Sequence, residues 1–187
     1  VLVAVVGVAQ LGTLTVYPAV AKRMNRRQLY TMGTVLVLIG YAIFFFAEVS
    51  ILLIAFGAVL VFVGQAFIQT LMLMFLADTV EYGHWKLGKR NESITFSIQP
   101  LIYKIGGAIA TGIVSMTLII SGIKIDGGTV DAIGPEGKLI IKIAMFAIPL
   151  LMIVAGYIVY LKKYKISEEY YAEILTELEA REASGKS

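Results

Sequence analysis

The sequence predicts an all-α membrane protein, and three observations indicate this. Of the 187 residues, 58% are hydrophobic and only 16% are charged, and the mean hydropathy is +0.83. A soluble domain of this size must cover its surface with charged side chains, yet here they are crowded into a few short zones. The apolar runs are also too long for strands and lack strict alternation of apolar and polar residues, so membrane-spanning strands are a poor alternative.

Five segments are long and apolar enough to cross the roughly 30 Å hydrocarbon core of a bilayer, which takes about 20 residues of helix. We expect these spans at 1–20, 29–47, 51–77, 94–121 and 139–161. They make residues 1–161 a transmembrane bundle, followed by a charged tail at 162–187. The tail is expected to be partly helical, a solvated amphipathic end in which Tyr170, Ile174 and Leu178 share one face.

Basic residues are distributed unevenly between the connections. The connection at 22–27 holds four Lys or Arg, the connection at 78–93 holds three, and the start of the tail holds three, against two in the other connections together. Lys and Arg favour the cytoplasmic side of a membrane. We therefore expect a multi-pass protein of the cell membrane, with these three segments in the cytoplasm.

The charge, the cysteine count and the first residues also indicate which partners, which cysteine chemistry and which kind of N-terminus to expect. The net charge is +3, but the basic residues flank apolar spans, so we expect no nucleic-acid partner. There is no cysteine, which excludes disulfides and thiolate metal sites. The chain opens at Val1 inside an apolar run, so we expect a truncated N-terminus, with part of the protein lying outside this chain.

Lys104 is the most informative residue because it lies about eleven residues into the fourth span. A central lysine costs about 2.5 to 3.5 kcal/mol on insertion scales, which favours a polar cavity with a partner, although a structural ion pair is an alternative. Gln99 lies near it, and Gln65 and Gln69 form a polar pair in the third span. Amides and an ammonium suit a polyhydroxylated ligand, while hydrogen bonding between helices is the simpler alternative.

Charged residues of both signs crowd the end of the third span. Opposite charges at the mouth of a helical bundle can form a breakable latch, as alternating access requires, but an ordinary solvated loop is also possible. Glu81 and His84 have the Glu-x-x-His spacing of a metal site, a weak signal without a second copy. Trp85 beside them is most simply a membrane-interface anchor. The charged residues are Asp78, Glu81, Lys86, Lys89, Arg90 and Glu92.

Residues 77–92, ADTVEYGHWKLGKRNE, continue as SITFSIQPLIYKIGGA. This stretch closely resembles the glycoside-pentoside-hexuronide:cation symporter family of the major facilitator superfamily, and most of all the branch that carries lactose in lactic acid bacteria. The likeness extends over nearly the whole chain, is specific at 77–107, and corresponds to helices eight to twelve of twelve. It implies a major-facilitator-type helical bundle, of which this chain supplies five transmembrane helices of the C-terminal half.

The resemblance implies roles for individual residues. Gln99 and Lys104 match sugar-site positions of the family, and the matching cytoplasmic charge network and coupling positions fall on Asp78, Glu81, Lys86, Arg90 and Glu92. Three positions depart from the pattern of well-known branches: Gln69 replaces a tryptophan, Pro100 a threonine, and Lys89 a histidine associated with proton coupling. The sugar contacts and the coupling ion are therefore open.

The resemblance further implies secondary active transport, by cation-coupled symport or exchange, of a glycoside, with galactosides such as lactose or melibiose expected. No catalytic residue, metal site or cofactor is expected. The coupling cation, Na⁺ or H⁺, is expected to bind mainly in the N-terminal half, outside this chain. The expected partners are the sugar, the cation, the lipid bilayer and a fused or separate cytosolic regulatory domain after the tail. Two alternatives stay open: an integral-membrane metal-dependent enzyme with a carboxylate/histidine site at the cytosolic face, and a non-transporting membrane sensor.

Overall fold

The computed structural model describes residues 2–47, 50–122 and 134–183, and every regular element in these ranges is helical. The expected all-α class is confirmed. Two glycines, Gly88 and Gly122, are the described residues with positive φ, and each follows the C-terminal end of a long helix. The elements are α1 (Leu2–Ala21), α2 (Arg26–Phe46), α3 (Ile51–Leu87), α4 (Glu92–Ile120), α5 (Pro135–Lys142), the π-helical turn η2 (Ile143–Ala147), α6 (Ile148–Lys163) and α7 (Glu168–Ala183).

Four helical segments in the described part of the chain are long and apolar enough to cross a membrane: α2, α3, α4 and the continuous segment Pro135–Lys163, which joins α5, η2 and α6. The 20 residues of α1 also include no charged side chain. At 1.5 Å per residue, the 37 residues of α3 extend for about 55 Å, well beyond the roughly 30 Å hydrocarbon core. One end of α3 must therefore project from the membrane.

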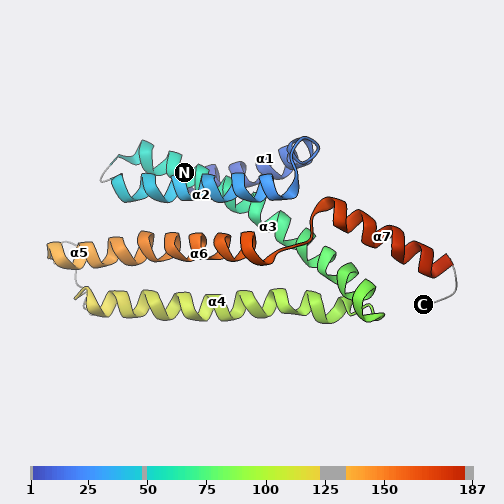
Figure 1. The fold of residues 1–187 in the computed structure, drawn as a ribbon. Helices are drawn as coiled ribbons and strands as arrows, with labels where there is room; N and C mark the ends of the chain where they lie inside the picture. Colours follow the sequence, from blue (N-terminus) through green and yellow to red (C-terminus); the bar gives the residue numbers. More distant parts are fainter. Residues whose placement is uncertain (1, 48–49, 123–133, 184–187) are drawn as a thin grey trace.

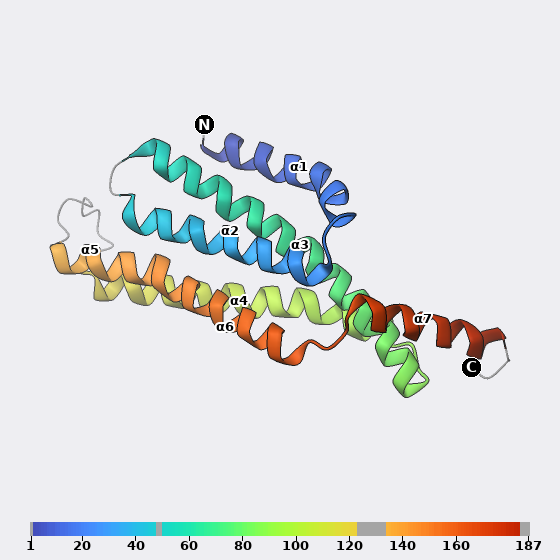
Figure 2. The ribbon, with the colours of Figure 1, turned by 45° about the horizontal axis from the view of Figure 1, so that its top comes forward.

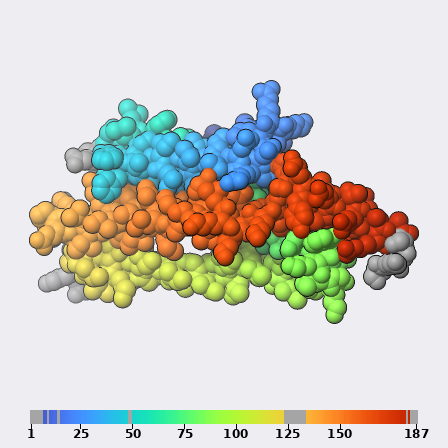
Figure 3. Space-filling model, in the orientation of Figure 1, coloured from blue at the N-terminus to red at the C-terminus, as the bar shows by residue number. Residues whose placement is uncertain are grey.

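The helices form two groups, α1 to α3 and α4 to α6, that meet where α2 lies beside η2 and α6 (Figures 1 and 2). Helices α2 and α3 run antiparallel, side by side, and α1 packs on α3. Helix α4 turns back from the end of α3 and lies along α5 and η2, while α6 reaches α2. Helix α7 lies past the end of α6 against the C-terminal part of α3. The space-filling view shows α6 between α2 and α4 on this face (Figure 3).

Helices α2 and α3 approach each other at two pairs of glycines, Gly33 with Gly64 and Gly40 with Gly57. A Cβ at Gly64 would lie 2.5 Å from the backbone oxygen of Gly33, and a Cβ at Gly40 would lie 2.8 Å from that of Gly57. Such distances leave no room for a side chain. Small residues at helix crossings let backbones approach and gain dispersion contacts, which matters in lipid because no hydrophobic effect drives the helices together.

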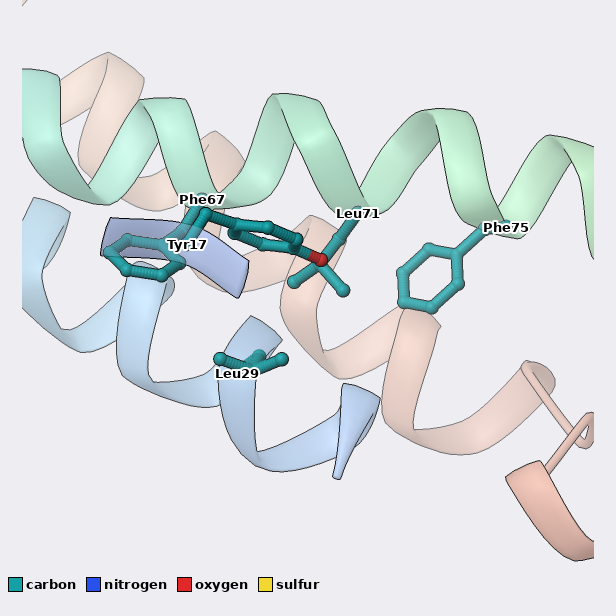
Figure 4. Close-up of a cluster of buried hydrophobic side chains, with 5 residues drawn as sticks. All are labelled: Tyr17, Leu29, Phe67, Leu71 and Phe75. Carbon is teal, nitrogen blue, oxygen red and sulfur yellow. The ribbon is translucent and has the colours of Figure 1, made fainter. Parts of the chain in front are cut away.

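The best-packed part of the bundle is an aromatic cluster near the start of α2 and the end of α6 (Figure 4). Leu71 at its centre is fully buried, and the ring of Phe75 lies 5.3 Å from the ring of Tyr160 and 4.6 Å from that of Tyr164. Four helices therefore converge at this end. The buried members of the cluster are Tyr17, Leu29, Phe67, Leu71 and Phe75.

Helix α3 continues ten residues past Ala77, where its apolar run ends, so the connection expected at 78–93 is mostly helical. Hydrogen bonds of a helix need no apolar side chains to continue, and the first effective stop is Gly88, whose φ of 66° gives a left-handed cap. Only Gly88 to Asn91 remain as a turn before α4 begins. Asp78, Glu81 and Lys86 consequently lie on the helix α3, while Lys89 and Arg90 lie in this turn and Glu92 begins α4.

Candidate functional site

Asp78 is the centre of the polar site at the converging end of the bundle. The residue is 2% exposed and lies on the face of α3 that packs against the other helices. The guanidinium of Arg26, in the first turn of α2, forms an ion pair with its Oδ2 atom, and the Tyr164 hydroxyl donates to the same oxygen at 3.2 Å. A buried carboxylate is tolerated when a charged partner and further donors compensate it, and here both are present.

Arg26 also connects the bundle to the tail helix. Its backbone N–H donates to Glu168 Oε1 at 2.9 Å, and its Nε atom lies 3.9 Å from the same oxygen. Its guanidinium carbon lies 5.2 Å from the centre of the Tyr171 ring. Glu168 thus places a negative charge at the N-terminus of α2, where the helix dipole favours it. One arginine holds α2, α3 and α7 together.

The tyrosines of this site keep their protons. Burial, followed by the nearby charge of Asp78 and the hydrogen bond to it, raises the pKa of Tyr164. Burial, with Asp78 and Glu81 as smaller causes, also raises the pKa of Tyr171. A phenol whose folded pKa is raised contributes stability below its unfolded value, about 10, and loses it as pH rises through the folded value. The donated bond from Tyr164 is therefore present throughout the physiological range.

A second charge cluster surrounds the turn between α3 and α4. Arg90 Nη2 lies 2.8 Å from Glu81 Oε1, and Arg90 Nε lies 3.8 Å from Glu92 Oε2. The Lys86 ammonium lies 3.5 Å from the Tyr82 hydroxyl and over its ring, without an acidic partner in the described chain. The side chain of Arg90 is 55% exposed, against 25% for Arg26. The charges expected to form one network therefore form two, one interior and one open.

Glu81, the carboxylate of the Glu-x-x-His pair with His84, is thus bound to Arg90. Among the residues that the structure describes, no three His, Cys, Asp or Glu side chains gather closely enough to hold a metal ion. The indole of Trp85 donates to Glu177 Oε2 at 2.5 Å, and Arg181 donates to the backbone oxygen of Trp85 at 2.9 Å. Trp85 therefore contacts α7, and its role as a membrane-interface anchor stays a prediction.

The tail helix is docked, and not simply solvated. On α7, Ile174 is 1% exposed and Leu178 is 7% exposed, on the face that packs against α3. The rings of Tyr82, Trp85 and Tyr170 pack beside them, with centres about 6 Å apart. The apolar face expected in the tail sequence is buried against the projecting end of α3.

The four expected sugar-site residues lie on α3 and α4, and no hydrogen bond or ion pair in the described chain brings them together. Gln65, Gln69 and Lys104 are exposed, while Gln99 is half-buried. Helices α3 and α4 diverge from the turn that joins them (Figure 1). Lys104 lies within two residues of the midpoint of α4, about 18 Å from its start, and α4 has no buried residue. This surface of α4 is open in the chain as it stands.

Three partners of the polar site were missed by the sequence reasoning: Arg26, Tyr164 and Glu168. Arg26 was counted among the basic residues that orient the membrane spans, which hid its role as an ion-pair partner. A signal existed for it, since Asp78 directly follows an apolar run and a carboxylate there needs a cation. Nothing in the sequence indicates which of several nearby cations pairs with Asp78, because that depends on the packing of α2 against α3.

A family model described as MFS/sugar transport protein matches residues 1–168 of the chain. The chain belongs to the MFS/sugar transport protein family. The expected resemblance is confirmed, and the match covers all the long apolar helices and stops where α7 begins. The interior Asp78 site and Lys104 both lie inside the matched region.

Several curated members of the MFS/sugar transport protein family are similar to the chain. It is 35% identical to a lactose permease of Lactobacillus delbrueckii subsp. bulgaricus and 38% identical to a raffinose carrier protein of Pediococcus pentosaceus, each over 165 residues. Both alignments cover 88% of this chain and 26% of the relative. A lactose permease of Leuconostoc lactis is 30% identical over 97% of the chain and 28% of its own length. The chain thus spans about a quarter of the length of these relatives.

Proposed function

We propose that the protein containing this chain is a secondary active transporter that moves a glycoside together with, or in exchange for, a coupling cation. The names of its relatives support the substrate class. Lactose and raffinose, after which these relatives are named, both carry a terminal galactose, so a galactoside is the proposed substrate. The coupling ion, Na⁺ or H⁺, would be held mainly by helices outside this chain.

Lys104 is the observation that carries this proposal. It lies near the midpoint of a 29-residue apolar helix, exposed, and without an acidic partner among the residues that the structure describes. A lone ammonium at membrane depth is costly unless it faces water, a ligand or a carboxylate. Its three donors suit sugar hydroxyls, and Gln99, five residues earlier on α4, adds an amide donor and acceptor. Gln65 and Gln69 would complete the site from α3.

The two charge clusters suit different tasks in such a transporter. Arg90 and Glu92 of the second cluster are exposed and Glu81 is half-buried, so the two exposed members could exchange partners with the rest of the protein when the access state changes. Lys86, also exposed, belongs to this proposed gate. Asp78 is proposed as its interior support, because its partners Arg26 and Tyr164 lie inside this chain.

The test is equilibrium binding of a labelled galactoside to the intact protein carrying Lys104→Met. Methionine keeps the length of the side chain and removes the charge, so insertion should be preserved while affinity falls about tenfold or more, the scale of one lost charge-assisted hydrogen bond. Lys104→Arg should rescue binding poorly, because a planar fork does not reproduce a compact ammonium.

Lys138→Met, at the start of the segment that contains α6, is the matched control, since it removes an equal charge far from the proposed site. It should bind the sugar as the unmodified protein does. Unchanged affinity in Lys104→Met would remove Lys104 from the sugar site. Binding without uptake of any glycoside, in vesicles with or without Na⁺ and a proton gradient, would contradict transport itself.

A further inference from the structure

Four acidic groups near the converging end of the bundle are already paired with arginines. Arg26 pairs with Asp78 and Glu168, and Arg90 pairs with Glu81 and Glu92. Six other cations at the ends of α1, α2 and α6 are exposed and have no ion pair within the described residues. These are Lys22, Arg23, Arg27, Lys162, Lys163 and Lys165. This end therefore carries a concentrated positive charge that the chain itself does not neutralise.

Two of these cations line a cleft between the first turn of α2 and the link from α6 to α7. The cleft has a volume of about 410 Å³, and its walls include Arg27 and Lys165 as well as the apolar surfaces of Tyr160 and Leu161. The ribbon views show these segments side by side (Figures 1 and 2). The cleft thus has a cationic part and an apolar part, next to each other.

Other charged groups in the cleft leave this positive character in place. Arg26 and Glu168 also line it, and the charge of Arg26 is shared between Glu168 and the buried Asp78 behind it. Glu169 is an exposed acid of the lining without an ion pair in the described chain. Against it stand Arg27 and Lys165, with Lys162 and Lys163 immediately before the link. A ligand of this cleft should therefore be an anion.

The position of the cleft identifies the class of anion. It lies where α2 begins and α6 ends, at the boundary of two membrane-crossing segments, on the side that positive charge predicts to be cytoplasmic. Basic pockets between helices at this boundary suit anionic lipid headgroups. We propose that the cleft binds an anionic phospholipid, with the phosphate between Arg27 and Lys165 and the glycerol and first acyl carbons against Tyr160 and Leu161.

The experiment is native mass spectrometry of the intact protein in detergent, titrated with dioleoyl phosphatidylglycerol and, separately, with dioleoyl phosphatidylcholine. We expect tighter retention of phosphatidylglycerol. The double variant Arg27→Gln, Lys165→Gln should weaken that retention about 30-fold, since each cation near an anionic surface is worth about 1 kcal/mol. The charge-retaining variant Arg27→Lys, Lys165→Arg should keep it, which separates loss of charge from misfolding.

Lys22→Gln, Arg23→Gln is the matched control, because it removes the same charge from the same end but outside the cleft. It should leave phosphatidylglycerol retention within about twofold of the unmodified protein. An equal loss of phosphatidylglycerol retention in the control would mean that the lipid is held by diffuse electrostatic attraction and not by the cleft, which would overturn the proposal. Competition by millimolar inorganic phosphate, or equal retention of the two lipids, would also overturn it, since the site would then recognise a free anion or any acyl chain.

Discussion

Asp78 is a buried carboxylate, so the free-energy cost of its charge differs from that of the other acids near it. Its partners come from three separate segments: Arg26 from α2, Tyr164 from the link after α6, and through Arg26 the tail residue Glu168. Burying a charge is costly, and that cost is offset only while every partner is in place. The loss of a single partner of Asp78 should therefore lower the free energy of unfolding strongly.

Arg26→Gln should lower the free energy of unfolding of the intact protein by about 3 to 5 kcal/mol, because it leaves the Asp78 charge buried and unpaired. Thermal unfolding in detergent, followed by the loss of helical circular dichroism, would measure this. The double variant Arg26→Gln, Asp78→Asn should recover part of the loss, since it removes the stranded charge as well. Strictly additive losses would mean that the two side chains are not coupled.

Arg90→Gln is the contrasting variant. Arg90 is more exposed than Arg26 and pairs with Glu81 and Glu92 near solvent, where ion pairs contribute at most about 1 kcal/mol. We expect its unfolding temperature to stay close to that of the unmodified protein, while sugar flux into vesicles falls and equilibrium sugar binding changes little. An unchanged flux would reduce this cluster to ordinary surface charge.

At the scale of elements, the α2–α3 pair depends on glycine in a way that the α4 glycines do not. Gly64 lies against the backbone of α2, whereas an added Cβ would meet nothing within 4 Å at Gly106, Gly107 or Gly112 of α4. The sequence shows small residues both in the α2–α3 pair and in α4. Only the packed structure distinguishes those that are in contact from those on an open surface.

Gly64→Ala should destabilise the protein by about 1 to 3 kcal/mol, because its Cβ would meet the Gly33 oxygen and the two helices would have to separate. Gly83→Ala, on the same helix but in open space, should be neutral or stabilising by up to about 1 kcal/mol, the helix-propensity gain. Urea or thermal unfolding of the pair compares them directly. Equal stability of the two variants would contradict close contact at Gly64.

The docking of α7 is a second property of an element, and Ile174 is its most buried residue. Ile174→Asp should release α7 from α3, because an aspartate there would be buried without a partner. Hydrogen exchange of α7 amides should accelerate by about tenfold or more, toward the rate of an isolated helix. Ala172→Asp, which places the same charge at an exposed position of α7, should leave exchange slow. Similar acceleration in both variants would mean that α7 is not held by its apolar face.

For the whole molecule, the topology prediction can be tested because the chain has no native cysteine. A single cysteine at Arg23, in the turn before α2, should react with a membrane-impermeant maleimide only from the cytoplasmic side. A cysteine at Gly134, just before α5, should react only from the outside. If both cysteines were labelled from one side in intact cells, the assignment of spans would be wrong.

The helices were predictable because lipid leaves a chain few options: apolar runs of this length must satisfy their backbone groups internally. The predicted spans at 29–47 and 94–121 lie within three residues of α2 and α4. The end of α3 was not predictable from hydropathy, because a helix leaving the membrane changes its side chains and not its hydrogen bonds. Gly88 was the better signal, as a potential left-handed cap.

The polar site was predictable in part. The sequence indicates that Asp78, Glu81 and Arg90 belong to an ion-pair region, but pairing is decided by contacts between residues far apart in the chain. Asp78 and Arg26 are 52 positions apart, while Glu81 and Arg90 are nine apart across one turn. The sugar-site residues stay a prediction, because α4 contributes an open surface and no contact within the described chain brings them together.

The projection of α3 also gives this chain a built-in optical reporter. Trp85 is the only tryptophan in the sequence, and its indole is held by Glu177 and surrounded by the rings of Tyr82 and Tyr170. Indole fluorescence shifts to longer wavelength when water replaces such a setting. The emission difference between the unmodified protein and its Trp85→Phe variant therefore isolates this one ring. Any event that releases α7 from α3 should then shift the emission maximum of Trp85, so it can be measured without an attached dye.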